Sequence, residues 1–398
     1  MLSFENTEIA FESKSNAELK RAHFLFKIIS KRWVVKFGKG FTNFAFSIHL
    51  PIKFLIKATI FKQFVGGESI DDCELAIKKL DEYKIGTILD YSVEGKEEEE
   101  SFIAVEKEIL RTIEKAKQDK RISFSVFKVS GLGRHYILEK RSKLVELDPE
   151  EKAEWGKIVN RVQTICAASH AANRPIFIDV EESWLQAAID ELALIMLRKF
   201  NTEKCIIYNT AQLYRHDRLK YIQDIFEIAK KENFYLGLKL VRGAYMEKER
   251  KRAEQMGYNN PIQPNKEAAD RDFDLAILFC MEHIDKIGIC LGTHNENSSL
   301  KLANELAARK IPFNHPHVFF AQLLGMSDHV SYNLAKDGYN VAKYVPYGPV
   351  KEVVPYLIRR AEENTSVKGQ TGRELSLIKK ELRRRKDPNS KSQIPNSK

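Results

Sequence analysis

Tyr235-Leu236-Gly237-Leu238-Lys239-Leu240-Val241 is a short, mostly apolar run that stops at Arg242-Gly243-Ala244, immediately before a helical pattern. A run of this length and composition predicts a buried β-strand. Seven similar runs occur along the chain, at residues 86–93, 122–129, 175–180, 205–210, 288–293, 317–323 and 340–345. Longer helical patterns lie between them, among them residues 184–200, 218–232, 268–283 and 298–308. Eight strands alternating with helices predict an α/β fold, a (βα)8 TIM-like barrel.

The length of the chain leaves room for extensions at both ends of such a barrel. A barrel of roughly 250–300 residues occupies most of the 398 residues without a second core. We therefore expect an N-terminal helical arm over residues 1–70, a barrel over 71–368 and a basic C-terminal tail over 369–398, with disorder at the tail's end.

Positive charge is concentrated in the two extensions. Residues 1–69 and 373–398 each carry a net charge of +6, which leaves −2 of the total +10 for the 303 residues between them. A nucleic-acid-binding protein usually carries a basic patch together with a recognisable motif, and no such motif is present. The charge distribution therefore argues against a nucleic-acid partner.

The five cysteines, Cys73, Cys166, Cys205, Cys280 and Cys290, form no CxxC pair and are odd in number. This argues against a disulfide framework or a zinc site, and we expect them to pack in the core of a protein in a reducing compartment, with no bound metal. The first residues show neither a signal-peptide nor a transit-peptide pattern, so we expect a cytoplasmic protein.

A phenylalanine-rich segment lies between Phe41 and Phe64. Lysines interrupt it, and its longest uncharged run, residues 40–52, has only 13 residues, too few to span a bilayer. Two interpretations remain open. The segment either lies on an anionic membrane surface, which would place the protein on the inner face of the cytoplasmic membrane, or packs against the barrel with its lysines pointing outward.

Polar side chains follow or end several of the predicted strands. They are Lys128, Asp179, Asn209, Thr210, Gln212, Arg242, Thr293, His294 and Asn295. In barrels of this class the chemistry lies at the carboxyl ends of the strands, so we expect these residues to share one rim. Arg242 followed by Gly243 and Ala244 combines a cation with close backbone approach, which suits a pyrophosphate, although no phosphate-binding loop motif accompanies it.

A paired-arginine helix follows the last predicted strand. Val353, Tyr356, Leu357 and Arg360 recur at helical spacing, which predicts a helix over residues 349–364 with one largely apolar stripe. Arg359 and Arg360 project about 100° apart, so they can grip one carboxylate from two directions, and Glu363 lies one turn away. A solvated helix face with an ordinary ion pair is the alternative.

Four ordered motifs together resemble the flavin-dependent proline dehydrogenases. They are residues 238–245 (Leu238 through Tyr245), Gly292-Thr293-His294-Asn295, Gln322-Leu323-Leu324-Gly325-Met326, and Tyr344 through Asn364. The resemblance extends over about residues 1–368 and is nearest to the stand-alone enzymes of mitochondrial type. It implies oxidation of L-proline to 1-pyrroline-5-carboxylate with FAD as cofactor, a membrane quinone as electron acceptor, and a 1-pyrroline-5-carboxylate dehydrogenase as the enzyme that uses the product.

The resemblance also assigns roles to residues. On the substrate side it implies Lys128, Asp179, Tyr245, Leu323, Tyr344, Arg359, Arg360 and Glu363. On the flavin side it implies Gln212, Lys239, Val241, Arg242, Gly243, Ala244, Thr293, His294 and Asn295. Met246 departs from the family pattern, which often has an aromatic residue there. The bulky Tyr344 favours proline over 4-hydroxyproline, because relatives that oxidise hydroxyproline have a small residue at that position.

Three alternatives stay open. The first is a dehydrogenase of 4-hydroxyproline or of another cyclic secondary amine. The second is a cofactor-free aldolase or lyase with Lys128 as a Schiff-base lysine. The third is a peripheral membrane-binding module, to which the basic extensions would contribute.

Overall fold

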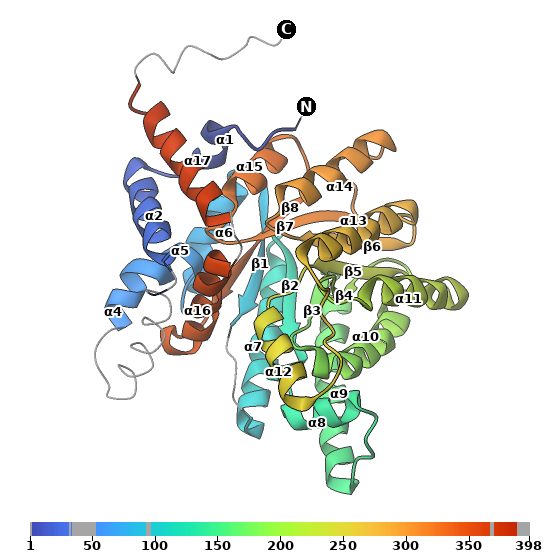
Figure 1. Cartoon of the computed structure of the whole chain (residues 1–398). Coiled ribbons are helices and arrows are strands. Elements are labelled where there is room, and N and C mark those ends of the chain that lie inside the picture. The colour runs from blue at the N-terminus through green and yellow to red at the C-terminus, as the bar shows by residue number, and fades with distance from the viewer. Residues whose placement is uncertain (1, 32, 34–52, 93–96, 367–369, 388–398) are drawn as a thin grey trace.

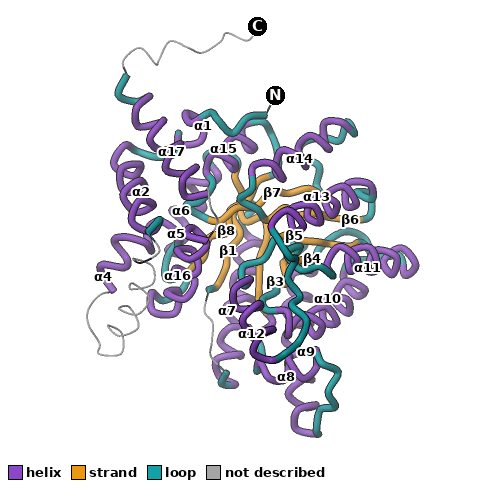
Figure 2. Tube along the Cα trace, in the orientation of Figure 1, coloured by secondary structure: helices purple, strands orange, loops and turns teal. Residues whose placement is uncertain are grey.

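Eight parallel strands close into a barrel in the order β1 to β8 (Figures 1 and 2). The structure is a computed structural model that describes all residues except 1, 32, 34–52, 93–96, 367–369 and 388–398. The strands are β1 (Ile85–Tyr91), β2 (Ile122–Lys128), β3 (Ile176–Asp179), β4 (Ile207–Gln212), β5 (Leu236–Val241), β6 (Ile287–Gly292), β7 (Val318–Leu323) and β8 (Val341–Tyr347). The predicted (βα)8 fold is confirmed, and every predicted strand begins and ends within two residues of the observed one.

Helices surround the barrel and separate its strands. They are α6 (Glu74–Asp81), α7 (Glu99–Gln118), α8 (His135–Ser142), α9 (Pro149–Ala171), α10 (Gln186–Phe200), α11 (Arg218–Glu232), α12 (Met246–Met256), α13 (Lys266–Glu282), α14 (Glu296–Ala308), α15 (Asp328–Lys336) and α16 (Val350–Ser366). A proline at the first turn and a reciprocal capping box between Asp148 and Glu151 start α9. All five cysteines are buried and unpaired, as predicted.

Aromatic side chains fill the inside of the barrel. The rings of Phe124 and Phe177 stack with centroids 4.3 Å apart, and Tyr208 meets both edge-on at 5.6 Å. Tyr344 lies parallel to Phe177 at 6.2 Å, one level closer to the carboxyl ends of the strands. The interior is therefore a packed core, and ligands have access only to the rim above it.

The two ends of the chain pack together outside the barrel. The N-terminal arm contains α1 (Thr7–Phe11), α2 (Asn16–Ile29), α4 (Lys53–Ile56), a π-helical turn (Lys57–Phe61) and α5 (Lys62–Phe64). The expected basic tail contains a further helix, α17 (Gln370–Arg384), which lies beside α1 and α2 (Figure 1). Leu377 and Ile378 of α17 are buried in a second apolar cluster with Phe11, Leu19 and Phe26 of the arm. Residues 370–384 are thus an integral part of the fold rather than a tail, because these apolar side chains leave water.

The phenylalanine-rich segment is described only in part. Residues 41–52 lie outside the described residues, and the remainder forms α4, the π-helical turn and α5. Phe61 and Phe64 pack in the second apolar cluster, whereas Phe54 is exposed. Among the described residues, no helix combines the length and apolarity needed to cross a membrane.

Candidate functional site

A lysine, an aspartate and a tyrosine meet above the aromatic floor of the barrel. Lys239 of β5 forms an ion pair with Asp179 of β3 and donates a hydrogen bond of 2.8 Å to the hydroxyl of Tyr344 of β8. The Tyr344 hydroxyl donates in turn to Asp179 over 3.4 Å. The Lys239 ammonium also lies 4.9 Å from the centroid of the Tyr344 ring and 5.4 Å from that of Phe177. Strands alternate their side chains, and in this barrel Asp179 and Lys239 point inward at the same level.

The surroundings hold Tyr344 as a neutral hydroxyl. Burial raises its pKa well above the usual value, and the neighbouring carboxylate of Asp179 adds to that effect. Tyr344 therefore offers a neutral phenol ring to the rim, while its O–H donates to Asp179. Leu323, which pairs with Tyr344 across β7 and β8, provides an apolar wall next to it.

Lys128 and Gln212 occupy the ends of neighbouring strands on the same rim. Lys128 ends β2 and pairs in register with Asp179 of β3. Gln212 ends β4, pairs with Val241 of β5, and donates to the carbonyl oxygen of Glu181 at 2.9 Å. Its own carbonyl, Oε1, is buried and accepts no hydrogen bond from the residues that the structure describes. A buried acceptor of this kind fits a ligand with a ring N–H.

Asn209 and Thr210 do not follow the fourth strand, as we expected, but lie within it. The amide of Asn209 points away from the rim and donates to Asp190 of α10 and Tyr221 of α11, at 2.8 and 3.0 Å. Thr210 donates to the carbonyl of Ile178 at 2.8 Å. β4 runs two residues further than predicted, so of the three candidates only Gln212 reaches the rim.

Arg242 is fixed in place by two helices and the end of β6. Its guanidinium bonds to Asp270 of α13 at 2.7 Å, Thr293 at 3.1 Å and Ser298 of α14 at 2.9 Å, and lies 4.2 Å from the centroid of the Phe273 ring. These contacts hold the cation at one position while leaving it half-buried. A preorganised arginine beside the start of α14 suits an anionic group such as a phosphate.

Gly243, the next residue, has no space for a side chain. Its φ of +128° disfavours residues with a Cβ atom, and an added Cβ would lie 2.4 Å from the ring of Tyr214. Ala244, which follows it, is exposed. Backbone at this position is therefore free to approach a ligand closely.

Thr293, His294 and Asn295 connect β6 to α14. Thr293 accepts hydrogen bonds from Arg242 and from the Asn295 backbone, each at 3.1 Å. Asn295 caps α14 by accepting from the Ser298 backbone at 3.2 Å. His294 Nδ1 lies 3.0 Å from the Ser327 hydroxyl, and burial, with the charges of Lys343 and Arg360, lowers the pKa of His294 to about 3. The imidazole is therefore neutral at physiological pH.

Arg360 is buried and not part of a solvated helix face. Val353, Tyr356, Leu357 and Arg360 of α16 form the predicted buried stripe, and Arg360 is only 8% exposed, with its guanidinium 5.0 Å from the Tyr356 ring centroid. Because the charge of Arg360 contributes to the low pKa of His294, the two side chains lie near each other.

The other residues expected around the arginine pair are described only in part. Arg359 is half-buried on the same helix. Glu363 also belongs to α16, but its side chain lies outside the described residues. Tyr245 begins α12 and is half-buried.

Sequence reasoning missed two buried carboxylates at the same rim. Asp90 of β1 is 8% exposed, accepts from the Ser92 hydroxyl at 3.0 Å, and adds its charge to those that raise the pKa of Tyr344. Glu181 follows β3 and accepts a hydrogen bond from Ser130. Asp90 was overlooked because it lies inside a predicted strand, and only its charge in an otherwise apolar run could have marked it.

The sequence was compared with models of protein families and with known proteins. A family model described as proline dehydrogenase matches residues 73–373. The chain is 34% identical over 427 residues to "Proline dehydrogenase 1, mitochondrial" of Dictyostelium discoideum, covering 96% of this chain and 74% of that protein. It is 32% identical over 324 residues to "Carbapenem antibiotics biosynthesis protein CarD" of Pectobacterium carotovorum subsp. carotovorum, covering 81% of this chain and 83% of that protein.

A solved structure supports the fold. Proline utilization A from Bdellovibrio bacteriovorus, inactivated by N-propargylglycine, superimposes with a TM-score of 0.71 at 19% sequence identity. The match covers 94% of this chain but only 38% of the other, and at this identity it bears on the fold alone. The match of the family model to most of the barrel, together with the relative aligned over nearly the whole chain, shows that this protein belongs to the proline dehydrogenase family of enzymes.

Proposed function

We propose that the protein oxidises L-proline to 1-pyrroline-5-carboxylate with FAD as cofactor. The reaction removes a hydride from the ring carbon beside nitrogen and a proton from the nitrogen, which leaves a C=N double bond. FAD, when bound, supplies the two-electron acceptor, and the side chains bind the substrate, orient it and exclude water. Membership of the proline dehydrogenase family supports the reaction.

The observation that carries the substrate assignment is the buried guanidinium of Arg360 at the edge of the rim. A guanidinium that is only 8% exposed can form strong, charge-assisted hydrogen bonds to the carboxylate of an amino acid. Arg359 and Lys128 are further cations on the elements that border the same mouth. In this proposal the three residues bind the substrate carboxylate, and Glu363 and Tyr245 position the arginines.

The apolar ring of proline needs a wall of matching shape, for which Leu323 and the ring of Tyr344 are suited. The Tyr344 hydroxyl is held by Lys239 and Asp179, so the ring has little freedom to move aside. A hydroxyl group on carbon 4 of the substrate would have to be accommodated against this fixed ring. The proposal therefore favours proline over 4-hydroxyproline, which remains the second candidate substrate.

The residues of the rim fit a flavin dinucleotide. The buried Oε1 of Gln212 can accept from a ring N–H, and Lys239 places a cation between β3 and β8. Arg242, the open backbone at Gly243 and Ala244, and the Thr293–Asn295 turn are suited to hold the phosphates and the sugar, with Val241 beneath them. The requirement for an electron acceptor also separates this proposal from a lyase, in which Lys128 would form a Schiff base without any redox partner.

We further propose that electrons leave through a membrane quinone, with the protein peripheral on the cytoplasmic membrane. Phe54 is exposed on the arm, and the side chains of Lys53 and Lys57 are 59% and 49% exposed although both pair with Glu68. An apolar side chain flanked by exposed lysines suits a lipid headgroup layer and supports this part. Anionic liposomes should bind the full chain but not a chain lacking residues 41–64. Equal binding by both chains would remove the arm from the proposal, and the quinone and a 1-pyrroline-5-carboxylate dehydrogenase would remain as proposed partners.

Product analysis tests the reaction. The FAD-loaded protein should reduce a soluble quinone in the presence of L-proline and form an imine that can be trapped with o-aminobenzaldehyde. Formation of the imine by the FAD-free protein would contradict a flavin-dependent reaction. Faster turnover of 4-hydroxyproline than of proline would support the second candidate substrate instead.

A further inference from the structure

The turn between β7 and α15, residues 324–327, is held from three directions. Gln63 of the N-terminal arm donates to the Gly325 carbonyl at 3.0 Å. Lys343 of β8 donates to the Met326 carbonyl at 2.7 Å. Glu374 of the C-terminal helix α17 accepts a hydrogen bond from the Ser327 backbone N–H. Both extensions of the chain therefore form hydrogen bonds with this short turn of the barrel.

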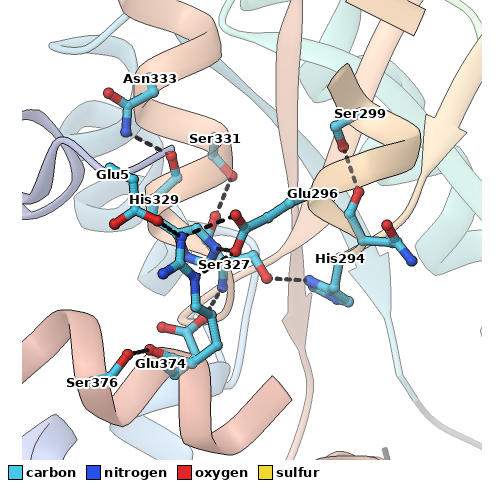
Figure 3. Close-up of polar contacts among 12 residues, drawn as sticks. Glu5, His294, Glu296, Ser299, Ser327, His329, Ser331, Asn333, Glu374 and Ser376 are labelled. Carbon is cyan, nitrogen blue, oxygen red and sulfur yellow. Dashed lines mark hydrogen bonds and ion pairs between the residues drawn. The ribbon is translucent and has the colours of Figure 1, made fainter. Parts of the chain in front are cut away.

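Ser327 adopts a backbone conformation that serine rarely takes. Its φ and ψ are +48° and +43°, in the left-handed region, and only 1% of the residue is exposed. Glycine would meet the same backbone requirement with less strain. What serine adds is a hydroxyl, and that hydroxyl points at His294 Nδ1, 3.0 Å away (Figure 3).

The hydroxyl can decide which imidazole nitrogen carries the proton. Within the described residues the Ser327 hydroxyl bonds to His294 alone, so an O–H that did not donate to Nδ1 would remain unsatisfied in a buried place. Donation from Ser327 makes Nδ1 the acceptor, and the proton of the neutral ring then lies on Nε2. His294 then carries its N–H on Nε2, a donor that suits an anionic or carbonyl oxygen.

We propose that Glu374 and Ser327 are positioning residues for His294, so that the C-terminal helix α17 is part of the cofactor site. Glu374 anchors the Ser327 peptide, the left-handed turn aims the Ser327 hydroxyl, and the hydroxyl fixes the orientation and tautomer of the imidazole (Figure 3). The inference rests on the proposed flavin site for its ligand. The geometry of the three residues does not depend on that ligand.

A purely structural role is the competing explanation. Glu374 would then only cap the N-terminus of α15, where free backbone N–H groups need acceptors. The two roles differ in what Ser327→Gly does. Glycine keeps the backbone N–H for Glu374 and tolerates the left-handed conformation, so the cap survives while the hydroxyl is lost.

The test uses the full chain and two readouts. Nitrogen-15 spectra of the histidine rings in the FAD-free protein, assigned with a His294→Gln variant, report the tautomer. Titration of flavin fluorescence reports FAD affinity. The wild type should show His294 protonated at Nε2, whereas Ser327→Gly should show a tautomer mixture and bind FAD about tenfold more weakly, as expected for one lost hydrogen bond.

Glu374→Ala should behave like Ser327→Gly, and Glu374→Gln, which keeps an acceptor oxygen, should restore most of the effect. Two changes on α17 serve as matched controls: Glu381→Ala removes a buried carboxylate that pairs with Arg384 and Arg385, and Ser376→Ala removes a hydroxyl that bonds within the helix. Both controls should leave the His294 tautomer and FAD affinity unchanged. In a His294→Ala background, Ser327→Gly should cause no further loss of FAD affinity.

An unchanged tautomer in Ser327→Gly would overturn the proposal, and so would a loss of FAD affinity that adds in full to that of His294→Ala. Failure of the proposed function has a different signature. If the wild type bound no FAD, the flavin function would be wrong, and the tautomer spectra of the FAD-free protein would still decide whether Ser327 and Glu374 position His294.

Discussion

Individual residues at the rim differ in whether their hydrogen-bonding groups already have partners within the protein. Lys239, Asp179 and Tyr344 bind one another, whereas the Gln212 carbonyl has no donor among the described residues. The first group is therefore preorganised and changes little on ligand binding, while Gln212 has a hydrogen bond to gain. Substitutions in the first group should affect stability and activity together, and substitution of Gln212 should affect mainly ligand affinity.

Arg360→Ala should weaken proline binding by about 1.5–3 kcal/mol, roughly a 10- to 150-fold rise in KM, because a charge-assisted hydrogen bond to the substrate carboxylate is lost. Steady-state kinetics with the FAD-loaded enzyme measures the effect. Arg198→Ala is the control, since Arg198 forms an exposed ion pair with Glu232 on the outer helices. Equal KM values for wild type and Arg360→Ala would exclude Arg360 from the substrate site.

Gly243→Ala should reduce FAD affinity, because the new Cβ atom would meet the Tyr214 ring at 2.4 Å in addition to the strain of a φ of +128°. Gly257→Ala offers a matched control: Gly257 also has a positive φ, +70°, but no atom lies within 4 Å of an added Cβ. Flavin titration should therefore show a larger loss for Gly243→Ala. Similar losses of FAD affinity in both variants would mean that backbone strain, and not the clash with the Tyr214 ring, is responsible.

At the scale of elements, the strands could be predicted and α17 could not. Strands such as β5 are continuous apolar runs bounded by turn residues, and this pattern has few competing interpretations. Residues 373–398 carry nine basic residues, so their composition resembled that of a solvated tail. Leu377 and Ile378 were too few to indicate a packed helix, because α17 packs mainly on α1 and α2, which lie more than 300 positions away in the sequence.

The positions of some candidate site residues on the barrel rim could likewise be predicted from the sequence, and others could not. Residues that end strands, such as Asp179 and Gln212, were found from barrel geometry, whereas the role expected for Lys239 came only from the resemblance to a family. Asp90 was missed inside its strand, and the link from Glu374 to Ser327 could not be foreseen, since nothing in the local sequence of α17 indicates which turn it contacts.

The packing of α17 predicts the effect of truncating its buried face. Leu377→Ala should destabilise the protein by about 2–5 kcal/mol, the usual cost of a cavity in a packed core. Ser376→Ala on the exposed face should change the free energy of unfolding by no more than about 0.5 kcal/mol. Denaturant unfolding compares the two, and equal stabilities would show that residues 370–384 act as a tail.

For the molecule as a whole, buried and half-buried ion pairs join both extensions to the barrel. Asp328 of α15 binds Lys14 of the arm and the buried Lys343 of β8. Glu296 of α14 binds His329 of α15 and Arg373 of α17. Because the carboxylates lie at the centres of these contacts, acid should loosen the extensions before it affects the apolar barrel.

The pKa of Glu296 gives the range of this acid sensitivity. Burial alone would raise it, but hydrogen bonds from His329 and Arg373 outweigh burial and lower the pKa of Glu296 to about 2 from a usual 4.5. A carboxylate whose pKa is lowered by folding stabilises the protein above its unfolded pKa, so the contribution is lost as pH falls from about 5 towards 2. As the pH is lowered across this range, the thermal unfolding temperature should fall less steeply for Glu296→Gln than for wild type. An equal slope in both would show that Glu296 contributes nothing to acid sensitivity, and Glu227→Gln, at an exposed position, controls for the loss of one charge.

The most direct test of the proposed function is the absorbance spectrum of the FAD-loaded protein before and after anaerobic addition of L-proline. The flavin band near roughly 450 nm should bleach, because proline transfers two electrons to the bound cofactor. A band that persists with proline but bleaches with another cyclic secondary amine would change the substrate. A protein that cannot be loaded with FAD, or whose flavin no such amine reduces, would contradict the account.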